Sequence, residues 1–183
     1  ATQADGKIVL AGRCAGVVNS DFCVARLNSD GTFDTGFVGP GGNGNGRFIL
    51  PIGPKNDAAY AIALQPDGKI VLAGTCANAF DVAEFCVARL NANGSLDIGF
   101  DGPAGTGNGK FTFPVSGVSD AANSLLLQPD GNIVLTGLCS GASVDFCAAR
   151  LLAGGGALDA SFAGPAGNGN GKFLFPIGLN TDT

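Results

Sequence analysis

The sequence contains no histidine, tryptophan or methionine, and it has one tyrosine, Tyr60, and one glutamate, Glu84. Histidine is the side chain that acts most often as a general base, and carboxylates are a common alternative. No two aspartates stand out by a fixed spacing that is kept along the chain. Sugar-binding faces are usually built from exposed tryptophan or tyrosine rings. The missing residue types therefore argue against a hydrolase and against a lectin, and we expect no catalytic residue, no metal site and no cofactor.

Charge is also scarce. Charged residues make up 14% of the chain, the net charge is −5, and the ten lysines and arginines are scattered. Because nucleic-acid binding needs clustered basic residues that neutralise phosphates, we expect no nucleic-acid partner. No apolar run approaches the length of a bilayer span. The N-terminal ATQADGK lacks the basic and hydrophobic regions of a signal peptide, so we expect a mature chain or a part of something longer.

What the sequence does contain is glycine, apolar residues and repetition. It has 31 glycines and 45% hydrophobic residues, too apolar and too weakly charged for a disordered chain. Its clearest repeated stretch, residues 61–90, reads AIALQPDGKIVLAGTC, then a variable segment, then FCVARL. Residues 3–27 and 125–151 repeat this pattern as QADGKIVLAGRC and LLLQPDGNIVLTGLC, followed by FCVARL and FCAARL.

The repeat has a long period. Asp5, Asp67 and Asp130 open Asp-Gly turns at intervals of 62 and 63 residues. We therefore divide the chain into units 1–54, 55–117 and 118–183, of which the first lacks most of its opening strand. A period of this length is long for one coil of a solenoid and typical of a unit with several strands, such as a propeller blade.

Within the middle unit, turn residues separate four strand-like segments. We expect strands at residues 60–64, 69–76, 85–90 and 110–115. Pro66 and Gly68 favour a tight hairpin turn between the first two strands, because proline presets its φ and glycine tolerates a positive φ. Gly6 and Gly131 take the place of Gly68 in the other two units. Pro114 favours a strand end or a sheet edge, where no ladder hydrogen bond is lost.

The second strand of each unit predicts how the units pack. Its apolar residues, as in Ile70–Ala73, are consecutive rather than alternating, which indicates a sheet covered on both faces. Four antiparallel strands that are covered by neighbouring units describe a blade of a β-propeller. The predicted fold is therefore all-β, with three tandem four-stranded antiparallel blades in a propeller-like array. A β-solenoid is the alternative. A closed propeller needs about four to eight blades, more than this chain supplies.

The combined motifs resemble a known family. The order A(I/L)xLQPDGKIVLAG, FxVARLNxDGSLDxxF and GxGKxxFP is similar to the delta-60 repeat, a family of tandem propeller-type units in large bacterial extracellular or surface proteins. The resemblance covers almost the whole chain. It implies a propeller fold and a secreted or surface setting in bacteria, and the family as a whole has no assigned catalytic chemistry.

The six cysteines fall two to each unit, at the base of a variable loop between two strands. We predict three local disulfides, which join Cys14 to Cys23, Cys76 to Cys86 and Cys139 to Cys147. Directly opposed residues of an antiparallel pair lie close enough for such a bond, at roughly 4.5 Å between Cα atoms. Buried free thiols are the alternative, and a zinc site is disfavoured because the spacing varies and histidine is absent. Regular pairing favours an oxidising, extracellular compartment.

A second repeated set consists of arginines and aspartates. An arginine ends each third strand and an aspartate follows the next turn, which gives the pairs Arg26 with Asp34, Arg89 with Asp97 and Arg150 with Asp159. A bidentate structural ion pair inside each blade is the favoured interpretation. A ring of arginines around an anionic ligand is the alternative, but it would need several blades to converge.

Two kinds of glycine-rich loop invite other interpretations. The turns at residues 28–34 and 91–97 resemble calcium loops, but the copies do not keep the oxygen donors that a calcium site needs. Turn formation accounts for every copy. The segments 41–46, 105–109 and 167–171 look like phosphate-binding loops, but a basic residue leads from each into a strand and not into a helix. We interpret them as hairpin connections.

These observations favour a non-catalytic extracellular scaffold that acts by presenting or polymerising blades, as a filament or a surface layer. Its expected partner is another copy of the chain or further repeats of a longer one. The alternative is a ligand-binding or adhesive propeller that uses the loops between the cysteines, at residues 15–22, 77–85 and 140–146, since loops on a rigid scaffold often carry recognition.

Overall fold

The computed structural model describes residues 1–141, 143–165 and 169–175. In this part of the chain every regular element is a β-strand, and none is a helix. The strands are β1 (Ile8–Ala15), β2 (Ser20–Leu27), β3 (Arg47–Leu50), β4 (Asp57–Leu64), β5 (Ile70–Ala77), β6 (Ala83–Leu90), β7 (Lys110–Phe113), β8 (Ser119–Leu127), β9 (Ile133–Ser140), β10 (Val144–Leu151) and β11 (Lys172–Phe175).

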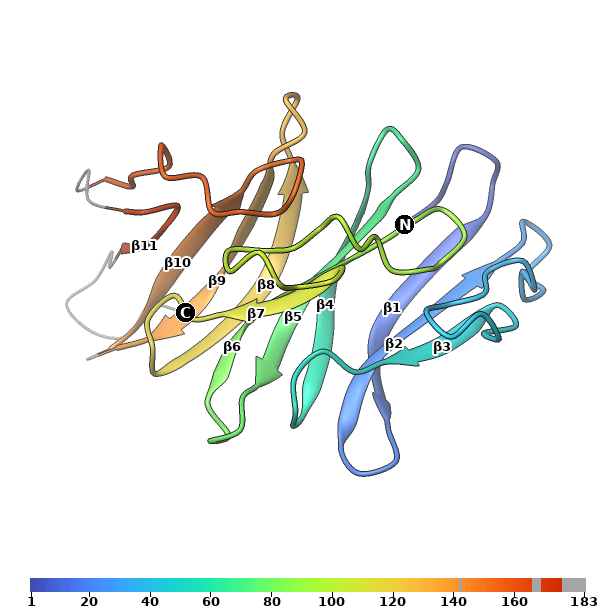
Figure 1. Ribbon diagram of the computed structural model, residues 1–183, viewed down its shortest axis with the longest axis horizontal. Helices are drawn as coiled ribbons and strands as arrows, with labels where there is room; N and C mark the ends of the chain where they lie inside the picture. Colours follow the sequence, from blue (N-terminus) through green and yellow to red (C-terminus); the bar gives the residue numbers. More distant parts are fainter. Residues whose placement is uncertain (142, 166–168, 176–183) are drawn as a thin grey trace.

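The strands form three antiparallel sheets, which we call blades 1, 2 and 3. Blade 1 has the order β1-β2-β3, blade 2 the order β4-β5-β6-β7 and blade 3 the order β8-β9-β10-β11, so each strand pairs with its neighbours in sequence. The blades stand side by side in a row from β1 to β11, and the row is not closed (Figure 1). The prediction of an all-β chain of antiparallel, propeller-like blades is confirmed.

Blade 1 has three strands and, beside β1, a short bridge formed by the first residues of the sequence. Ala1 and Thr2 pair with Val9 and Ile8 of β1, at the place where blades 2 and 3 have the ends of β4 and β8. The hairpin turn between these residues and β1 is intact: the amide of Gly6 donates to the carbonyl of Gln3 over 3.0 Å. Beyond Val9 that edge of β1 has no partner strand among the described residues.

Several predicted strand ends differ from the observed ones. The first strand of the middle unit begins at Asp57 and not at Tyr60, because a β-bulge lets the ladder continue past Tyr60. The third begins at Ala83, two residues before the predicted start. The fourth ends at Phe113, since Pro114 has no amide hydrogen to continue the pairing.

The hairpin turns have the conformation that their sequence favours. In blade 2 the amide of Gln65 donates to the carbonyl of Lys69 over 2.8 Å, which leaves a three-residue loop between them. The φ angles of Gly6, Gly68 and Gly131 are +81°, +85° and +85°. Such a loop combines a type I turn with a final residue in the left-handed region, where glycine is the least strained choice.

The core consists of two apolar clusters, each between two neighbouring blades. One cluster joins residues of blade 1, such as Val9 and Phe22, to residues of blade 2, such as Leu72. The other joins Val71 of blade 2 to Leu135 of blade 3. Each blade thus has a leading face, which contacts the next blade, and a trailing face, which contacts the previous one. The consecutive apolar residues of β5 are buried because blade 2 is covered on both faces.

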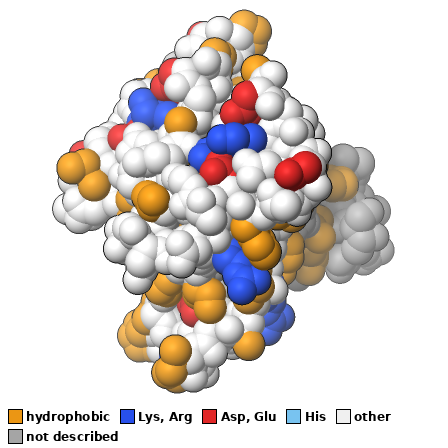
Figure 2. Space-filling view, turned by 90° about the vertical axis from the view of Figure 1, so that its right-hand side faces the viewer, with side chains coloured by type: hydrophobic (Ala, Val, Ile, Leu, Met, Phe, Trp, Pro, Cys, Tyr) orange, Lys and Arg blue, Asp and Glu red, His pale blue; other side chains and the backbone are white. Residues whose placement is uncertain are grey.

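No other described blade covers the two outermost faces of the row. Leu10, on the trailing face of blade 1, is 48% exposed, whereas its counterparts Leu72 and Leu135 are 0% exposed. The side of the molecule next to blade 1 shows hydrophobic side chains among polar ones, with a group of them in the lower half beside basic side chains (Figure 2). None of the described segments is a helix of the length and hydrophobicity that crossing a membrane requires.

Candidate functional site

Each blade contains one disulfide, as predicted, and it joins β1 to β2 in blade 1, β5 to β6 in blade 2 and β9 to β10 in blade 3. The Cα–Cα distances are 5.6 Å for Cys14–Cys23, 5.7 Å for Cys76–Cys86 and 5.8 Å for Cys139–Cys147. The expectation that the cysteines oppose each other directly is wrong. Cys14 lies opposite Asp21, and Cys23 lies opposite Gly12. The bonds therefore join diagonal neighbours on one face of the sheet, which the strand twist brings within reach.

The three disulfides differ in burial. All of them lie on the trailing faces, so those of blades 2 and 3 are covered by the blade before them, and their four sulfur-bearing residues are fully buried. Cys14 of blade 1 is exposed and Cys23 is partly exposed. The difference follows from the uncovered trailing face of blade 1.

The predicted ion pairs form in each blade, but through one nitrogen only. The arginine Nε lies 2.8 Å, 2.7 Å and 2.8 Å from the aspartate Oδ2 in the pairs Arg26–Asp34, Arg89–Asp97 and Arg150–Asp159. The predicted bidentate pairing inside the blade is therefore wrong. In Arg26 and Arg89, further guanidinium nitrogens instead donate to backbone carbonyls of the following blade.

Arg89 shows this second contact most completely. Its Nη1 donates to the carbonyl of Ala153 and its Nη2 to that of Gly154, each over 2.6 Å. Both carbonyls belong to the turn after β10 in blade 3. In the same way, Nη1 of Arg26 donates to the carbonyl of Ala92 in the turn after β6. Arg26 and Arg89 therefore each join the aspartate of their own blade to a turn of the next blade.

A phenylalanine ring accompanies each arginine. The guanidinium carbon of Arg89 lies 4.2 Å from the ring centre of Phe100, and that of Arg26 lies 4.5 Å from the ring centre of Phe37. Such stacking adds a cation–π attraction that increases as the pair is removed from water. The rings of Phe37 and Phe100 are fully buried, because each also packs against the turn of the next blade.

The turn that receives the ring requires glycine for two reasons. Gly94 has a φ of +91° and Gly156 a φ of +77°, which side chains rarely adopt. In addition, a Cβ on Gly94 would lie 2.8 Å from the ring of Phe37, and one on Gly156 would lie 2.6 Å from that of Phe100. The third copy keeps this ring contact although its turn, between Leu152 and Ala157, is one residue longer than the turn between Asn91 and Ser95. We call this unit, which consists of the arginine, the aspartate that pairs with it, the phenylalanine and the receiving turn, the interblade clasp.

At each end of the row, one half of the clasp has no partner in the part of the chain that the structure describes. Among the described residues, Arg150 of blade 3 contacts only its own blade, and its side chain is 20% exposed, against 8% for Arg26 and 6% for Arg89. Phe162, which lies under Arg150, is only partly buried. At the other end, a Cβ on Gly31 would meet nothing within 4 Å, although Gly31 is the counterpart of Gly94.

Two carboxylates of the clasp, those of Asp34 and Asp159, have a lowered pKa, which favours their ionised form. Burial opposes the ionisation of Asp34, but hydrogen bonds from Lys7 and from the amide of Gly36, and the charge of Arg26, outweigh it. The pKa of Asp34 therefore lies below the ordinary 3.8. Hydrogen bonding from Ser161 lowers the pKa of Asp159 in the same direction, and the neighbouring Arg150 adds to this.

A second polar group lies at the contact between blades 1 and 2. Asp57 is almost fully buried, and its Oδ2 accepts from the amides of Ile52 and Gly53 at 2.8 Å and 2.9 Å. Burial raises the pKa of Asp57, and it also raises that of Asp21 and lowers that of Lys110. Nζ of Lys110 donates to the carbonyl of Pro51 in blade 1. Asp57 thus stabilises the connection between two blades, and Asp120 does so in the same way before blade 3.

The turns considered for calcium are closed by their own side chains. Oδ1 of Asp30 accepts from the amide of Thr32 over 2.9 Å and from its hydroxyl over 2.6 Å. In the described part of the chain, no three histidine, cysteine, aspartate or glutamate side chains are grouped so that they could hold a metal ion. The oxygen atoms of these turns therefore serve the turns themselves.

The loops between the cysteines lie along one edge of the row, opposite the hairpin turns (Figure 1). Val17 and Val18 in blade 1 and Phe80 in blade 2 are among the most exposed apolar side chains of the molecule. The predicted loop of blade 3 includes residue 142, which lies outside the described residues. The exposed apolar tips of these loops were not singled out in the sequence.

Sequence comparison relates the repeated unit to a described family. A family model with the description "Domain of unknown function (DUF5122) beta-propeller" matches residues 3–37, 65–100 and 128–162. The matches together cover more than half of the 183 residues, and each ends at the phenylalanine of the interblade clasp. No curated protein matches the chain.

Proposed function

The chain belongs to the DUF5122 β-propeller family, and we propose that it is a non-catalytic structural repeat protein whose blades act by binding other blades. The family description assigns no activity. The closer relationship to the delta-60 repeat is part of this proposal and agrees with the order of the repeated motifs.

The interblade clasp supports the scaffold role. Its arginine, aspartate, phenylalanine and glycine recur in every repeat, and in blades 1 and 2 the arginine and the ring serve the contact with the next blade. A residue that recurs in each copy and contacts the neighbouring copy has a role in stacking. The repeated polar residues are thus used by the architecture itself.

The same contact supports self-assembly, with another copy of the chain as the partner. The free half at blade 3 consists of Arg150 and Phe162, and the free half at blade 1 is the turn that contains Ser29 and Gly31. We propose that the first half of one copy binds the second half of another. Such a contact between two different surfaces is heterologous, so it closes a ring of copies or extends into a filament.

Two charged substitutions test this assembly. Leu10→Lys places a charge on the trailing face of blade 1, and Thr136→Lys places one on the leading face of blade 3, where blade 2 has the buried Ala73. The wild type should exceed 18.1 kDa in light scattering as its concentration rises, and each variant alone should remain at that mass. An equimolar mixture of the variants should form pairs and no larger species, because one free face remains on each copy.

The mixture separates this proposal from other modes of association. If like faces bound each other, one of the two variants would still self-associate, which would contradict a heterologous contact. Val18→Lys, in a fully exposed loop, is the matched control and should assemble like the wild type. A wild type that stays monomeric at every concentration would overturn self-assembly.

The proposed location is extracellular or on the cell surface, in bacteria. The three disulfides support it, because such bonds persist in oxidising compartments and are rare in the cytosol. Intact mass of the native protein, measured after thiol alkylation with and without reduction, should reveal six thiols only after reduction. Free thiols in the native protein would remove the support for this location.

A second candidate function is adhesion through the loops between the cysteines. The observation that favours it is the exposure of Val17, Val18 and Phe80 at the loop tips, since exposed apolar groups often mark contact sites. Replacing residues 16–19 and 79–82 with Gly-Ser segments distinguishes the two functions. Assembly should survive the replacement if the protein is a scaffold, whereas binding to host or bacterial surfaces should be lost if the loops are adhesive.

A further inference from the structure

Asp21 is a buried carboxylate to which the described residues provide no hydrogen-bond donor. It lies near the start of β2, opposite Cys14, and it is 5% exposed. Its Oδ1 has no hydrogen-bond partner, and no described residue donates to its other oxygen. Because a buried charge costs free energy unless a partner compensates it, such a carboxylate is suited to binding a cationic group from outside.

Blade 2 supplies a donor at the same place in the repeat. Its counterpart of Asp21 is Glu84, whose Oε1 accepts from Nδ2 of Asn78 over 2.8 Å. In blade 1 the position of Asn78 is taken by Gly16. A Cβ on Gly16 would lie 2.1 Å from Oδ2 of Asp21, so the carboxylate occupies the space in which a side chain would stand. The loop of blade 1 thus has a carboxylate without the internal donor of blade 2.

The charges around Asp21 leave room for one more positive charge. Oδ1 of Asp57, in the neighbouring blade, also lacks a hydrogen-bond partner. Burial raises the pKa of Asp57, and the charge of Asp21 adds to this, so the two carboxylates lie near each other. Lys110 is close enough to act on both, but its Nζ donates to the carbonyl of Pro51. Two negative charges therefore face one positive charge, and a further cationic group would balance them.

A depression of about 510 Å³ borders Asp21 at the edge of the row that carries the loops between the cysteines. Five apolar residues line it, namely Val17, Val18, Ile49, Pro51 and Pro54. Nδ2 of Asn19 donates to the carbonyl of Lys55 over 2.7 Å, which fixes the loop to the segment that leads to blade 2. Apolar walls around a carboxylate suit an aliphatic chain with a positively charged end better than a hydrated inorganic ion.

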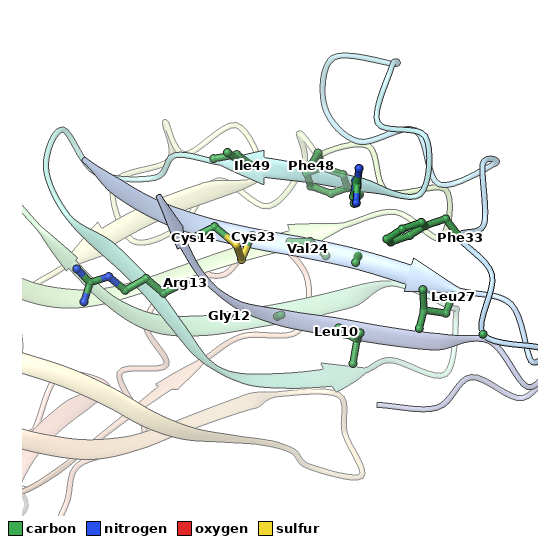
Figure 3. A pocket seen from close by; sticks show the side chains of 14 residues that line it. Leu10, Gly12, Arg13, Cys14, Cys23, Val24, Leu27, Phe33, Phe48 and Ile49 are labelled. Atoms are coloured by element: carbon green, nitrogen blue, oxygen red, sulfur yellow. A yellow bond between two sulfur atoms is a disulfide. The ribbon is translucent and has the colours of Figure 1, made fainter. Parts of the chain in front are cut away.

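This depression differs from the surface on which blades stack. A larger one, of about 790 Å³, lies on the trailing face of blade 1 beside the Cys14–Cys23 disulfide, and Ile49 borders both (Figure 3). The loop edge, in contrast, stays open in a blade that has a neighbour before it. Blade 2 is covered on its trailing face by blade 1, and Phe80 at its loop tip is still 87% exposed.

We propose that the loop of blade 1 binds a primary alkylammonium group, carried by a lysine side chain of another polypeptide or by a free aliphatic amine. The ammonium group would donate to the free oxygens of Asp21. Its methylene stem would pack on Val17 and Val18, which are 103% and 94% exposed, and so remove apolar surface from water. The inference goes beyond the proposed scaffold function, because it concerns the loop edge and not the contact between blades.

The test is a titration of the isotope-labelled full chain, followed by two-dimensional NMR of its backbone amides. The chain carries Thr136→Lys, which is expected to prevent self-association and lies in blade 3. Nα-acetyl-lysine methylamide represents the lysine side chain, and pentylamine represents a free amine; the tighter binder identifies the source. The amides of Gly16, Val17 and Val18 should shift saturably. The norleucine analogue, which has the stem without the charge, and sodium or calcium chloride should cause no saturable shift.

Asp21→Asn is the decisive variant. It keeps the shape of the side chain and removes its charge, so both amines should bind about tenfold more weakly or not at all. Its melting temperature should not fall, because a carboxylate without a partner does not stabilise the fold. Asp145→Asn is the matched control, since Asp145 is the counterpart in blade 3 and its Oδ2 accepts from the hydroxyl of Ser143 over 2.7 Å. The control should bind the amines like the parent chain.

Three results would each overturn the inference: no saturable binding of either amine, equal binding of the norleucine and lysine analogues, or unchanged binding by Asp21→Asn. Saturable shifts with sodium or calcium chloride but not with the amines would also overturn it, because they would identify a site for an inorganic cation. The scaffold proposal would be unaffected, since its test measures the association of whole chains.

Discussion

Arg89 shows how one side chain stabilises two blades at once. Its Nε binds Asp97 within blade 2, its Nη atoms bind two carbonyls of blade 3, and its plane covers Phe100. Lysine supplies a single ammonium group and cannot make these contacts together. Arg150 makes the first and the third contact, through Asp159 and Phe162, but in the described part of the chain it has no carbonyl partners in another blade.

We therefore predict unequal effects of one substitution at two equivalent positions. Arg89→Lys should lower the free energy of unfolding by about 2 to 4 kcal/mol, because buried charge-assisted hydrogen bonds are lost. Arg150→Lys should lower it by about 1 kcal/mol or less, as expected for a partly exposed pair. Urea denaturation of both variants measures the difference. Equal losses would mean that the contacts with the next blade contribute little.

The disulfides offer a second comparison between equivalent residues. Reduction of a disulfide needs access of the reductant to a sulfur atom, and only Cys14–Cys23 is exposed. This bond should be reduced first under native conditions, while Cys76–Cys86 and Cys139–Cys147 resist until the blades separate. Stepwise alkylation followed by peptide mass mapping gives the order. Simultaneous loss of all three bonds would contradict the observed burial.

The decrease in the free energy of unfolding at acidic pH should depend on Asp34. Its pKa is lower in the folded chain than the ordinary 3.8, so its stabilising contribution is present above that value and is lost as the pH falls through the folded pKa. Asp57 has a raised pKa, so its contribution has the opposite sign and is lost as the pH rises above 3.8. Asp34→Asn should flatten the loss of stability in acid, and Asp57→Asn should not. Urea unfolding between about pH 2 and pH 6 measures both slopes.

At the scale of elements, the conformation of each hairpin turn is determined by the residues of the turn itself. Gly68 has a φ of +85°, a region that β-branched side chains resist. Gly68→Val should therefore reduce the free energy of unfolding by more than the roughly 1 kcal/mol of a conformationally compatible glycine replacement. Thermal or urea denaturation measures the change. Gly6→Val and Gly131→Val serve as internal comparisons, and a neutral result at all three positions would contradict the assigned turn.

Local signals explain why the strands and turns could be predicted from the sequence. Pro66 and Gly68 specify a turn by their own backbone preferences, and consecutive apolar residues such as Val71 and Leu72 specify a buried strand. The bulge at Tyr60 was missed because a bulge depends on how two strands pair and not on the residues of one strand. For the same reason the diagonal geometry of the cysteines was not foreseen.

The candidate site was predicted only in part. The spacing of Arg89 and Asp97 within one repeat indicated their ion pair. The bonds from Arg89 to Ala153 and Gly154 connect residues more than sixty positions apart, in the neighbouring repeat. No local pattern reports which face of one blade meets which turn of the next. The sequence did show that arginine, phenylalanine and glycine recur at the same interval in each repeat. We interpreted the arginine as part of a contact inside its own blade, and so the contact with the next blade was missed.

At the scale of the whole molecule, the strands that are best covered by their neighbours lie in blade 2, in the middle of the row. The edges of β5 pair with β4 and β6, and blade 2 is covered on both faces, whereas β1 has an open edge and an open face. Amide exchange follows local opening, which is rarer where a strand is covered on all sides. Hydrogen exchange with mass spectrometry should show the slowest exchange in β5, intermediate exchange in β9 and the fastest in β1. Equal protection of β1 and β5 would contradict the open edge.

The offset of the clasp, with its arginine in one blade and its turn in the next, has a consequence for how such a chain can lengthen. Each repeat encodes a donor half and an acceptor half, so a duplicated segment of the gene would specify a new blade whose interface already exists. No second binding surface would have to arise by mutation. The shared interface also constrains substitutions, because a change in the repeated clasp residues would have to be compatible with both neighbouring blades.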